Sequence, residues 1–526
     1  MSGYNWMMRS SLMFVFVGLC LTGFWSCEKQ NNCTPCSSVD ATEQIVVAPD
    51  KAPHKEPKPN IPEQVAPEPS PELNSPQEKG PSPEKIGPEE NPEPPKKPLP
   101  TPTRCGAPTK AFYKTPSSMG QRFVAKAGSV FRCEELGKRT AYNVSFDAIF
   151  KASGGTPTHG YRILRIAYVT QAPAGVFRPT TALVYVPINA QGQCEANASI
   201  ATVCHGTMGS GPACGPSRFP GYGLDYMALP LAARGYLLVA PDYLGLGMPS
   251  DIGHPYLVSE PTVFATLDAV KAVRELAQSG ALQGCVGNRM LLVGHSQGGH
   301  AALATAQKAS QYLPKVQHVG TIAYAPAFGD ARVWNAPFTA KLLTTAGTAY
   351  LMAFLIGAQR YYKGPALKEW LVPGAAARME ALLESMCFTE FSKFFYTTMP
   401  TLGDIFTSKF LSASVACNSG KGNCSSFQPW ERYIRQSVVG DFATKVPTLL
   451  VQGSLDALVT AKSVQCIEER LRKKSSPVEN CVVPTANHST IVASTWFSLL
   501  PWIKSVMAGK TPPKVLCPSN RLPTCQ

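Results

Sequence analysis

The chain has 526 residues, and its 44% of hydrophobic residues can fill a sizeable core, so disorder throughout the chain is excluded. Only 16% of the residues are charged, which excludes a coiled coil and a charged tail protein that binds nucleic acid. The formal net charge of the whole chain is +14, and residues 105–526 alone carry +17, from 39 basic and 22 acidic side chains. This excess suits an anionic surface or a polyanionic substrate, or else serves only solubility.

The N-terminus, residues 1–26, has the pattern of a secretory signal peptide. Arg9 precedes an apolar run at residues 12–25, which is shorter than the roughly 20 residues that a membrane-spanning helix needs. Ser26 and Cys27 follow this run and resemble the cleavage site of bacterial lipoproteins, in which the cysteine receives a lipid. We expect export, either as a membrane-anchored lipoprotein through Cys27 or, after ordinary signal cleavage, as a secreted protein.

Residues 27–104 differ in composition from the rest of the chain. Proline makes up about a third of residues 49–102 and is interleaved with Glu and Lys, without apolar periodicity. Such a segment cannot bury enough apolar surface to offset the entropy lost on ordering. We expect a disordered, extended tether that acts as a spacer, with a ligand for proline-binding modules as the alternative.

From residue 105 onward, short strand-like runs alternate with helical patterns. Several of these runs are continuously apolar, such as MLLV and TLLV, as strands buried on both faces are. The alternation predicts an α/β fold with a mostly parallel sheet and helices on both faces. We assign residues 105–330 and 441–526 to this core. The expected strands are residues 161–169, 182–186, 200–204, 236–240, 290–293, 320–325, 448–451 and 481–483.

Residues 331–440 interrupt the alternation. They lack buried-strand runs and are rich in apolar and aromatic residues, as in AYLMAFLIGA and CFTEFSKFFY. An insertion of this length is too long for a loop. We expect a helical cap or lid over the carboxyl edge of the sheet, with an ordinary extension of the core as the alternative.

The pentapeptide Gly294-His295-Ser296-Gln297-Gly298 follows the apolar run MLLV and precedes a helical pattern. A nucleophile on a sharp strand-to-helix turn has a strained backbone, so the residues two positions away on each side must be very small. The G-x-S-x-G spacing meets this requirement, and the following helix directs its N-terminal amides toward a developing oxyanion. We predict that Ser296 is a catalytic nucleophile.

A serine hydroxyl needs a base to remove its proton. Of the eight histidines, His488 fits best because it lies between the last expected strand and the last helix, whereas His295 would point away from Ser296. Asp456, just past the preceding strand, is the expected acid that orients this histidine. The rival acid, Asp441, precedes that strand and would lie at the other edge of the sheet. The order serine, aspartate, histidine is the one that hydrolases with such sheets use.

Two backbone N–H groups should hold the oxyanion. One is expected from Gln297, the residue after the nucleophile. The other is expected from the loop after the strand at 200–204, where the sequence HGTMG begins at residue 205. We favour the N–H of Thr207 over that of Met208, and the alternative is that the HG pair is only a tight turn.

Several motifs together resemble the secretory lipases and related bacterial lipase-like esterases of the α/β-hydrolase fold. They are GHSQGG at 294–299, APDYLGLG at 240–247, HPYL at 254–257, and HGT followed by CGPS within 205–217, and the resemblance spans about residues 160–505. The family pattern implies a triad of Ser296, Asp456 and His488. It also implies an inserted lid that helps to form an acyl-binding tunnel, and a structural role for Asp242 at a strand-end turn.

Residues 105–526 contain 13 cysteines, which supports export. Short separations make three pairs plausible, sequence alone leaves the connectivity open, and an odd number leaves at least one cysteine unpaired. These pairs are Cys417–Cys424, Cys466–Cys481 and Cys517–Cys525. The sequence has neither a zinc-like spacing of Cys and His nor a phosphate-binding glycine-rich loop, so we expect neither a metal nor a cofactor.

These features predict an exported serine hydrolase of lipase or esterase type that cleaves carboxylic esters through an acyl-enzyme on Ser296. His488 would take the serine proton, and the amides of Gln297 and Thr207 would hold the oxyanion. The expected partner is an ester substrate, with a lipid-like ester as one candidate, and we expect a monomer that does not bind nucleic acid. The alternatives are a serine peptidase on the same fold and a non-catalytic, hydrolase-like binding domain.

Overall fold

The computed structural model describes residues 100–115, 126–221, 224–329, 346–399, 401–418, 424–518, 522–523 and 525. The expected signal peptide, Cys27 and nearly all of the tether lie outside these residues, as does the start of the expected cap at 331–345. Among the described helices, none combines the length and the hydropathy that crossing a membrane requires.

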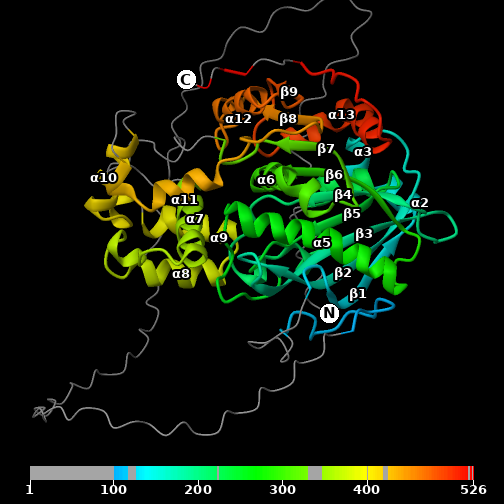
Figure 1. Ribbon diagram of the computed structural model, residues 1–526, viewed down its shortest axis with the longest axis horizontal. Helices are drawn as coiled ribbons and strands as arrows, with labels where there is room; N and C mark the ends of the chain where they lie inside the picture. The colour runs from blue at the N-terminus through cyan, green and yellow to red at the C-terminus, as the bar shows by residue number, and fades with distance from the viewer. Residues whose placement is uncertain are drawn as a thin grey trace, which may run out of the picture. The chain divides into compact units, whose positions relative to one another are not determined.

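A nine-stranded sheet organises the described chain (Figure 1). The strands lie in the order β1-β2-β3-β5-β4-β6-β7-β8-β9, antiparallel from β1 to β5 and parallel from β5 to β9. The predicted α/β fold with a mostly parallel sheet is confirmed, and every expected strand overlaps a strand of this sheet. The strands are β1 (Val130–Arg139), β2 (Gly160–Gln171), β3 (Phe177–Ile188), β4 (Ala198–Cys204), β5 (Leu237–Pro241), β6 (Val286–His295), β7 (Gln317–Tyr324), β8 (Thr448–Gly453) and β9 (Val478–Val483).

The sequence analysis missed one strand, β1. Its residues, VFRCEELGKR, are mostly polar and contain no apolar run. β1 lies at the edge of the sheet and pairs only with β2, with two irregularities in register. An edge strand can keep polar side chains because one side of it is not packed against another strand. The apolar pattern that marks the central strands is therefore absent here.

Helices cover both faces of the sheet. One face is covered by α5 (Ser259–Ser279), α6 (Gln297–Tyr312) and α12 (Ala461–Lys473). The other is covered by α4 (Asp225–Ala232) and α13 (Ile491–Met507), together with the short α2 (Ala141–Ser145) and α3 (Ala148–Ala152). Within β6, Met290 and Leu292 belong to the first apolar layer, and Leu291 and Val293 belong to the second. This double burial explains why the run MLLV is continuously apolar.

Between β7 and β8 the chain forms a helical segment with its own core, named here the helical insertion (residues 346–437). In Figure 1 its helices lie together on the left, beside α5 and α6. Its buried side chains, such as Phe354 and Trp430, cluster with Tyr256 and Leu257 from the loop that follows β5. The insertion thus packs on a loop at the carboxyl end of a parallel strand. The helices are α7 (Ala346–Tyr362), α8 (Ala375–Ser385), α9 (Phe388–Thr398), α10 (Ser408–Asn418) and α11 (Trp430–Ser437).

Disulfides join distant parts of the described chain. Of the three pairs expected from short separations, Cys417–Cys424 is confirmed, and the other two are wrong. Cys466 pairs with Cys525, and Cys481 pairs with Cys517, because the C-terminal tail returns along α12 and β9. The Val515 and Cys525 amides donate to Glu479 and Glu469 and hold the tail there. The remaining bridges are Cys105–Cys133, Cys194–Cys285 and Cys214–Cys387, and Cys204 is the free cysteine among the described residues.

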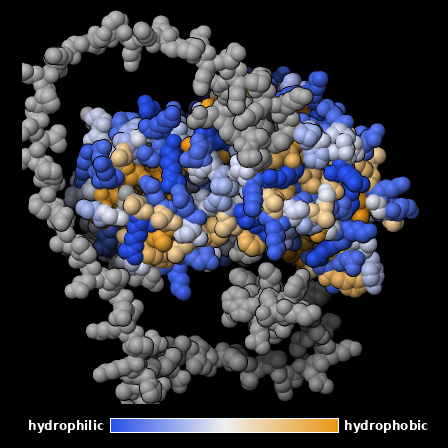
Figure 2. Space-filling view, turned by 90° about the horizontal axis from the view of Figure 1, so that it is seen from below, coloured by the Kyte–Doolittle hydropathy of each residue, from blue (hydrophilic) through white to orange (hydrophobic). Residues whose placement is uncertain are grey.

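Figure 2 shows one face of the molecule, on which hydrophilic and apolar residues are interspersed. Among the described residues, the most exposed large apolar side chains are Leu516, Phe497 and Tyr142, and they come from the C-terminal tail, α13 and α2. Scattered exposed apolar residues are common on protein surfaces. The distribution on this face therefore marks no binding surface by itself.

Candidate active site

Ser296 lies on the sharp turn between β6 and α6. Its backbone has φ +60° and ψ −118°, a conformation that non-glycine residues rarely adopt and that stores strain. A Cβ at Gly294 would overlap the carbonyl group of Gly298, and a Cβ at Gly298 would overlap that of Cys204. Both glycines of the G-x-S-x-G pattern are thus required sterically. The Ser296 N–H donates to the Tyr324 carbonyl of the neighbouring strand β7, 2.9 Å away, which holds the turn against the sheet.

Asp456 and His488 form a hydrogen-bonded pair. His488 Nδ1 lies 2.7 Å from Asp456 Oδ2. The other carboxylate oxygen of Asp456 accepts from the backbone N–H groups of Leu458 and Val459, at 2.9 and 2.8 Å. The Asp456 side chain is fully buried, so its orientation is set by these three bonds. With Nδ1–H donating to the carboxylate, Nε2 is left as the basic nitrogen of the imidazole.

The pair lies at the same edge of the sheet as Ser296. Asp456 follows β8, His488 follows β9 and Ser296 follows β6, and these strands are parallel members of one sheet. The ring of His295, next to Ser296 in the chain, lies with its centroid 4.6 Å from that of His488. No hydrogen bond joins Ser296 to His488 among the described residues, and in free enzymes such bonds are often longer than in the reacting complex.

His295 has a position that the sequence analysis did not anticipate. It was expected only to point away from Ser296, and in the structure its ring packs against His488. Its Nδ1 lies 3.3 Å from the hydroxyl of Tyr226 on α4. Burial, and next the nearby His488, lower the pKa of His295 to about 3. His295 is therefore neutral near pH 7 and does not oppose a positive charge on its neighbour.

The two expected oxyanion amides face no competing acceptor. Gln297 is the first residue of α6, so its N–H has no partner within the helix. Among the described residues, the N–H groups of Gln297 and Thr207 donate to no other group. The loop that carries Thr207 lies against the turn, since a Cβ at Gly206 would be 3.9 Å from the Ser296 Cβ. Neither amide is therefore committed to another group of the described residues.

Side chains of the HPYL motif fix the residues that carry these amides. The Tyr256 hydroxyl lies 2.8 Å from Thr207 Oγ1. His254 donates through Nδ1 to the Leu244 carbonyl at 2.9 Å, and its Nε2 accepts from the side-chain amide of Gln297 at 3.0 Å. Burial lowers the pKa of His254 to about 4, which keeps Nε2 able to accept near pH 7. The motif was visible in the sequence, but its contacts with Thr207 and Gln297 were not.

Asp242 ties the loop after β5 to the CGPS segment. Its carboxylate is fully buried and accepts from the Ser217 N–H at 2.8 Å, and from the hydroxyl groups of Ser217 and Thr181. Burial raises the pKa of Asp242 to about 6, although these hydrogen bonds act in the opposite direction. A Cβ at Gly247 would overlap the carboxylate, so the glycine in APDYLGLG allows the turn to close around it.

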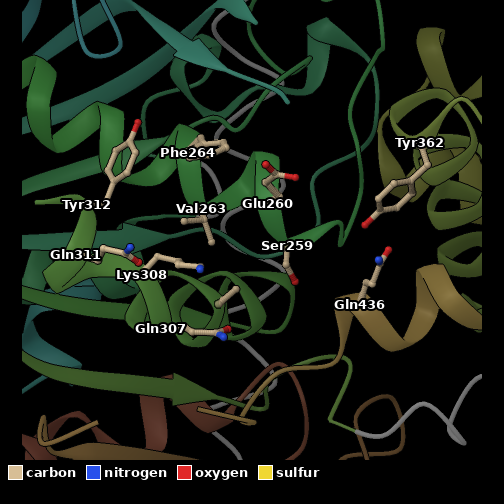
Figure 3. Close-up of a pocket in the computed structure, with 11 residues that line it drawn as sticks. Ser259, Glu260, Val263, Phe264, Gln307, Lys308, Gln311, Tyr312, Tyr362 and Gln436 are labelled. Carbon is tan, nitrogen blue, oxygen red and sulfur yellow. The ribbon is translucent and has the colours of Figure 1, made fainter. Parts of the chain in front are cut away.

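A pocket of about 660 Å³ lies between the core and the helical insertion, away from these residues (Figure 3). In Figure 3, Tyr362 and Gln436 reach it from the insertion, and Glu260 and Lys308 reach it from α5 and α6. Neither the Asp–His pair nor the nucleophile candidate lines it. This pocket is therefore separate from the residues that the sequence analysis predicted to be catalytic. Its wall consists of Ser259, Glu260, Val263, Phe264, Ala304, Gln307, Lys308, Gln311, Tyr312, Tyr362 and Gln436.

No group of three or more His, Cys, Asp or Glu side chains within the described residues is arranged to hold a metal ion. At the carboxyl edge of the sheet the structure holds the hydroxyl of Ser296 and the hydrogen-bonded imidazole and carboxylate of His488 and Asp456. Acyl transfer to a serine requires groups of these kinds, namely a nucleophile, a base and an orienting acid, together with donors for the oxyanion.

Comparisons with known proteins identify the family and the fold of the chain. The model of the family described as secretory lipase matches residues 223–514, more than half of the chain. No curated protein matches the sequence. Among solved structures, the rice cell wall degrading esterase LipA from Xanthomonas oryzae is 23% identical, with a TM-score of 0.60, and the match covers 73% of this chain and 97% of that one.

Two further structures extend the comparison. A putative hydrolase from Legionella pneumophila is 21% identical, with a TM-score of 0.57, and the match covers 70% of this chain and 96% of that one. Candida antarctica lipase A is 17% identical, with a TM-score of 0.56, and the match covers 79% of this chain and 89% of that one. At these identities the likeness shows the fold, which is that of the α/β-hydrolases.

Proposed function

The chain belongs to the secretory lipase family, and from this membership we propose that it is an exported serine hydrolase that cleaves carboxylic esters through an acyl-enzyme on Ser296. The observation that carries the proposal is the 2.7 Å bond between His488 and a buried Asp456, next to the strained turn of Ser296. Family membership makes the chain an ester hydrolase, and the proposal adds the residues and the route.

The proposed reaction has two halves. His488 Nε2 takes the Ser296 proton as Oγ bonds to the ester carbonyl carbon, and the carbonyl oxygen becomes an oxyanion. When the intermediate collapses, the C–O bond to the alcohol breaks, and the alcohol leaves with the proton from His488. A water molecule then loses a proton to His488, attacks the acyl-enzyme, and releases the carboxylic acid and the free serine.

Charges develop in two places, and the proposal assigns a group to each. The positive charge on His488 faces the Asp456 carboxylate, while the neighbouring His295 stays neutral because its pKa is about 3. The negative charge on the oxyanion faces the N–H groups of Gln297 and Thr207. Donors held in place before the reaction stabilise such charge without the cost of reorienting water.

We further propose that the helical insertion is the cap over this site and helps to bind the acyl chain. In support, Phe388 of α9 donates its N–H to the Met208 carbonyl, 2.9 Å away, in the loop that carries Thr207. The apolar core of the insertion includes Tyr256, whose hydroxyl bonds Thr207. A lipid-like ester would match such an apolar cover. A series of p-nitrophenyl esters of increasing acyl length tests this, since the cap predicts that kcat/KM rises beyond acetate.

Export and anchoring remain part of the proposal. The six disulfides of the described residues support an oxidising compartment. Lipidation of Cys27 predicts that the wild-type protein sediments with membranes and that Cys27→Ser releases it. Equal release of both proteins would point to ordinary signal cleavage and secretion.

The direct test is Ser296→Ala. We expect kcat for p-nitrophenyl butyrate to fall by a factor on the order of 10⁶, as when a serine triad loses its nucleophile. A fluorophosphonate probe should label the wild-type protein but not the variant. The matched control is Ser494→Ala, an exposed serine on α13 that bonds only within its own helix.

Three outcomes would contradict the proposal. Retained ester hydrolysis in Ser296→Ala would exclude this serine as the nucleophile. Faster cleavage of aminoacyl anilides than of esters by the wild-type protein would favour the peptidase alternative. A folded wild-type protein that neither hydrolyses esters nor reacts with the probe would favour a non-catalytic binding domain.

A further inference from the structure

We propose that the helical insertion clamps the oxyanion loop from two sides, through the Cys214–Cys387 disulfide and through a path of aromatic side chains. The oxyanion loop is defined as residues 205–211. This inference rests on the proposed function, because it assigns positioning residues to the site proposed above. None of these residues touches the reacting atoms.

The first side of the clamp is covalent and lies just beyond the loop. Cys214 and Cys387 are 173 residues apart in sequence, and their bridge joins the segment after the oxyanion loop to the start of α9. Next to the bridge, Gly209 and Cys387 pair as in an antiparallel sheet, and the Phe388 N–H donates to the Met208 carbonyl at 2.9 Å. A Cβ at Gly209 would lie 2.6 Å from the Cys214 sulfur, so only glycine fits there.

The second side consists of stacked rings. Thr207 Oγ1 lies 2.8 Å from the Tyr256 hydroxyl. The Tyr256 ring lies nearly parallel to that of Tyr350 on α7, with 6.3 Å between centroids. Tyr350 in turn stacks on Phe388 at 4.2 Å. The contacts thus run from Thr207 through two tyrosines to Phe388, which returns to Met208, and the path closes on itself.

This closed path matters because the oxyanion amide belongs to a loop. The Gln297 amide is held by α6, but Thr207 has no helix or strand to fix it. Catalytic groups must be held within about 0.5 Å of their productive positions, and loops meet this demand only when neighbouring groups support them. The clamp supplies that support from the insertion. Cys214, Cys387 and Phe388 therefore position the Thr207 amide.

The test is the double variant Cys214→Ser/Cys387→Ser. The matched control is Cys194→Ser/Cys285→Ser, which removes a bridge at the amino end of β6, about 30 Å from Ser296 for a strand of this length. We expect the clamp variant to lose roughly 10- to 100-fold in kcat for p-nitrophenyl butyrate, less than the 10²–10³ for removal of a whole oxyanion donor. KM should change less than about threefold, because the amide acts on the transition state rather than on the bound ester.

A second measurement does not depend on activity. Hydrogen exchange of the amides at 206–211 should speed up in the clamp variant and stay unchanged in the control. Unchanged exchange and kcat in the clamp variant, or equal loss of kcat in both double variants, would overturn the clamp. A wild-type protein without esterase activity would instead overturn the proposed function, and the exchange data would still decide the clamp.

If the double variant does not fold, Tyr256→Phe gives an independent reading. It removes only the hydroxyl that bonds Thr207 and keeps the ring stack. We expect kcat to fall about 5- to 10-fold with KM nearly unchanged, as for loss of one neutral hydrogen bond. The control is Tyr142→Phe on α2, an exposed tyrosine. A loss in kcat that is no larger than in this control would also overturn the proposal.

Discussion

The turn at Ser296 and the oxyanion loop face each other across the site, but they are held in different ways. The turn is shaped by five consecutive residues and by the strand and helix that flank them. The oxyanion loop takes its position from Tyr256, Tyr350 and Phe388, which are distant from it in sequence. A local motif can thus specify the turn that carries Ser296, whereas the position of Thr207 depends on packing between the core and the insertion.

After Ser296→Ala, the largest expected effect concerns His488, the proposed base in both halves of the reaction, and the carboxylate that orients it. Asp456→Asn should lower kcat about 10⁴-fold, because an amide would favour the wrong histidine tautomer and would not stabilise its positive charge. Steady-state kinetics on p-nitrophenyl butyrate measure this. Asp441→Asn, at the other end of β8, is the control and should leave kcat within about twofold, so a loss there instead would move the acid to that residue.

A pair of glycine variants compares the two regions directly. Gly298→Ala should lower the free energy of unfolding by several kcal/mol and abolish activity, because its Cβ would overlap the Cys204 carbonyl. Gly209→Ala should lower kcat and cost less stability, since its Cβ would overlap the disulfide-bonded Cys214 side chain rather than a backbone carbonyl. Thermal unfolding and kinetics on both variants check this. Equal loss of stability in both would show that the loop is as rigidly built as the turn.

Acid should destabilise the protein through its buried histidines. Burial lowers the pKa of His318 to about 4, below the 6.5 of the unfolded chain, so the unfolded state binds more protons. The stabilisation is fully present above pH 6.5 and falls as the pH drops toward 4, by roughly 2 kcal/mol between pH 7 and 5 for one such histidine. Urea unfolding at both pH values should show a smaller pH effect in His318→Gln than in the wild type.

His318 lies on β7, and its Nε2 contacts the Gly320 carbonyl and the Thr321 hydroxyl. It faces no carboxylate or cation in these contacts, so its titration reports on burial. His159→Gln, a partly exposed histidine paired with Glu195, is the control. An identical pH effect in the wild type and His318→Gln would contradict the assignment.

The smallest expected effect is the absence of a jump in rate at a lipid interface. If the clamp already holds the oxyanion loop in place, binding to a lipid surface is not needed to bring the Thr207 amide into position. Hydrolysis of tributyrin should then rise smoothly through its solubility limit, with less than about a twofold step. A steep step in the wild type that disappears in Cys214→Ser/Cys387→Ser would show that the clamp restrains a closed form instead.

The parts of the site that were predicted from the sequence share a physical origin. Ser296 is marked by the two glycines that its strained turn requires, and Asp456 and His488 directly follow buried parallel strands. Because such strands end at one edge of the sheet, their loops meet there. The Asp–His bond was expected on these grounds, and its 2.7 Å length and the burial of the carboxylate come from the structure.

The parts that were missed depend on contacts between distant segments. β1 lacks an apolar run because it is an edge strand. Two disulfide pairs were wrong because short separations say nothing about the tail that returns along α12 and β9. The packing of His295 against His488 joins the end of β6 to a loop 193 positions away and leaves no local pattern.

The sequence alone determined the α/β class, the strained serine turn and the family, because each rests on steric and hydrophobic rules that act over a few residues or on one repeating pattern. Only the tertiary structure decided which cysteines pair, where Tyr256 and Phe388 meet the oxyanion loop, and how His254 holds Gln297. Those contacts depend on how separate surfaces dock, and many docked arrangements are compatible with the same local pattern.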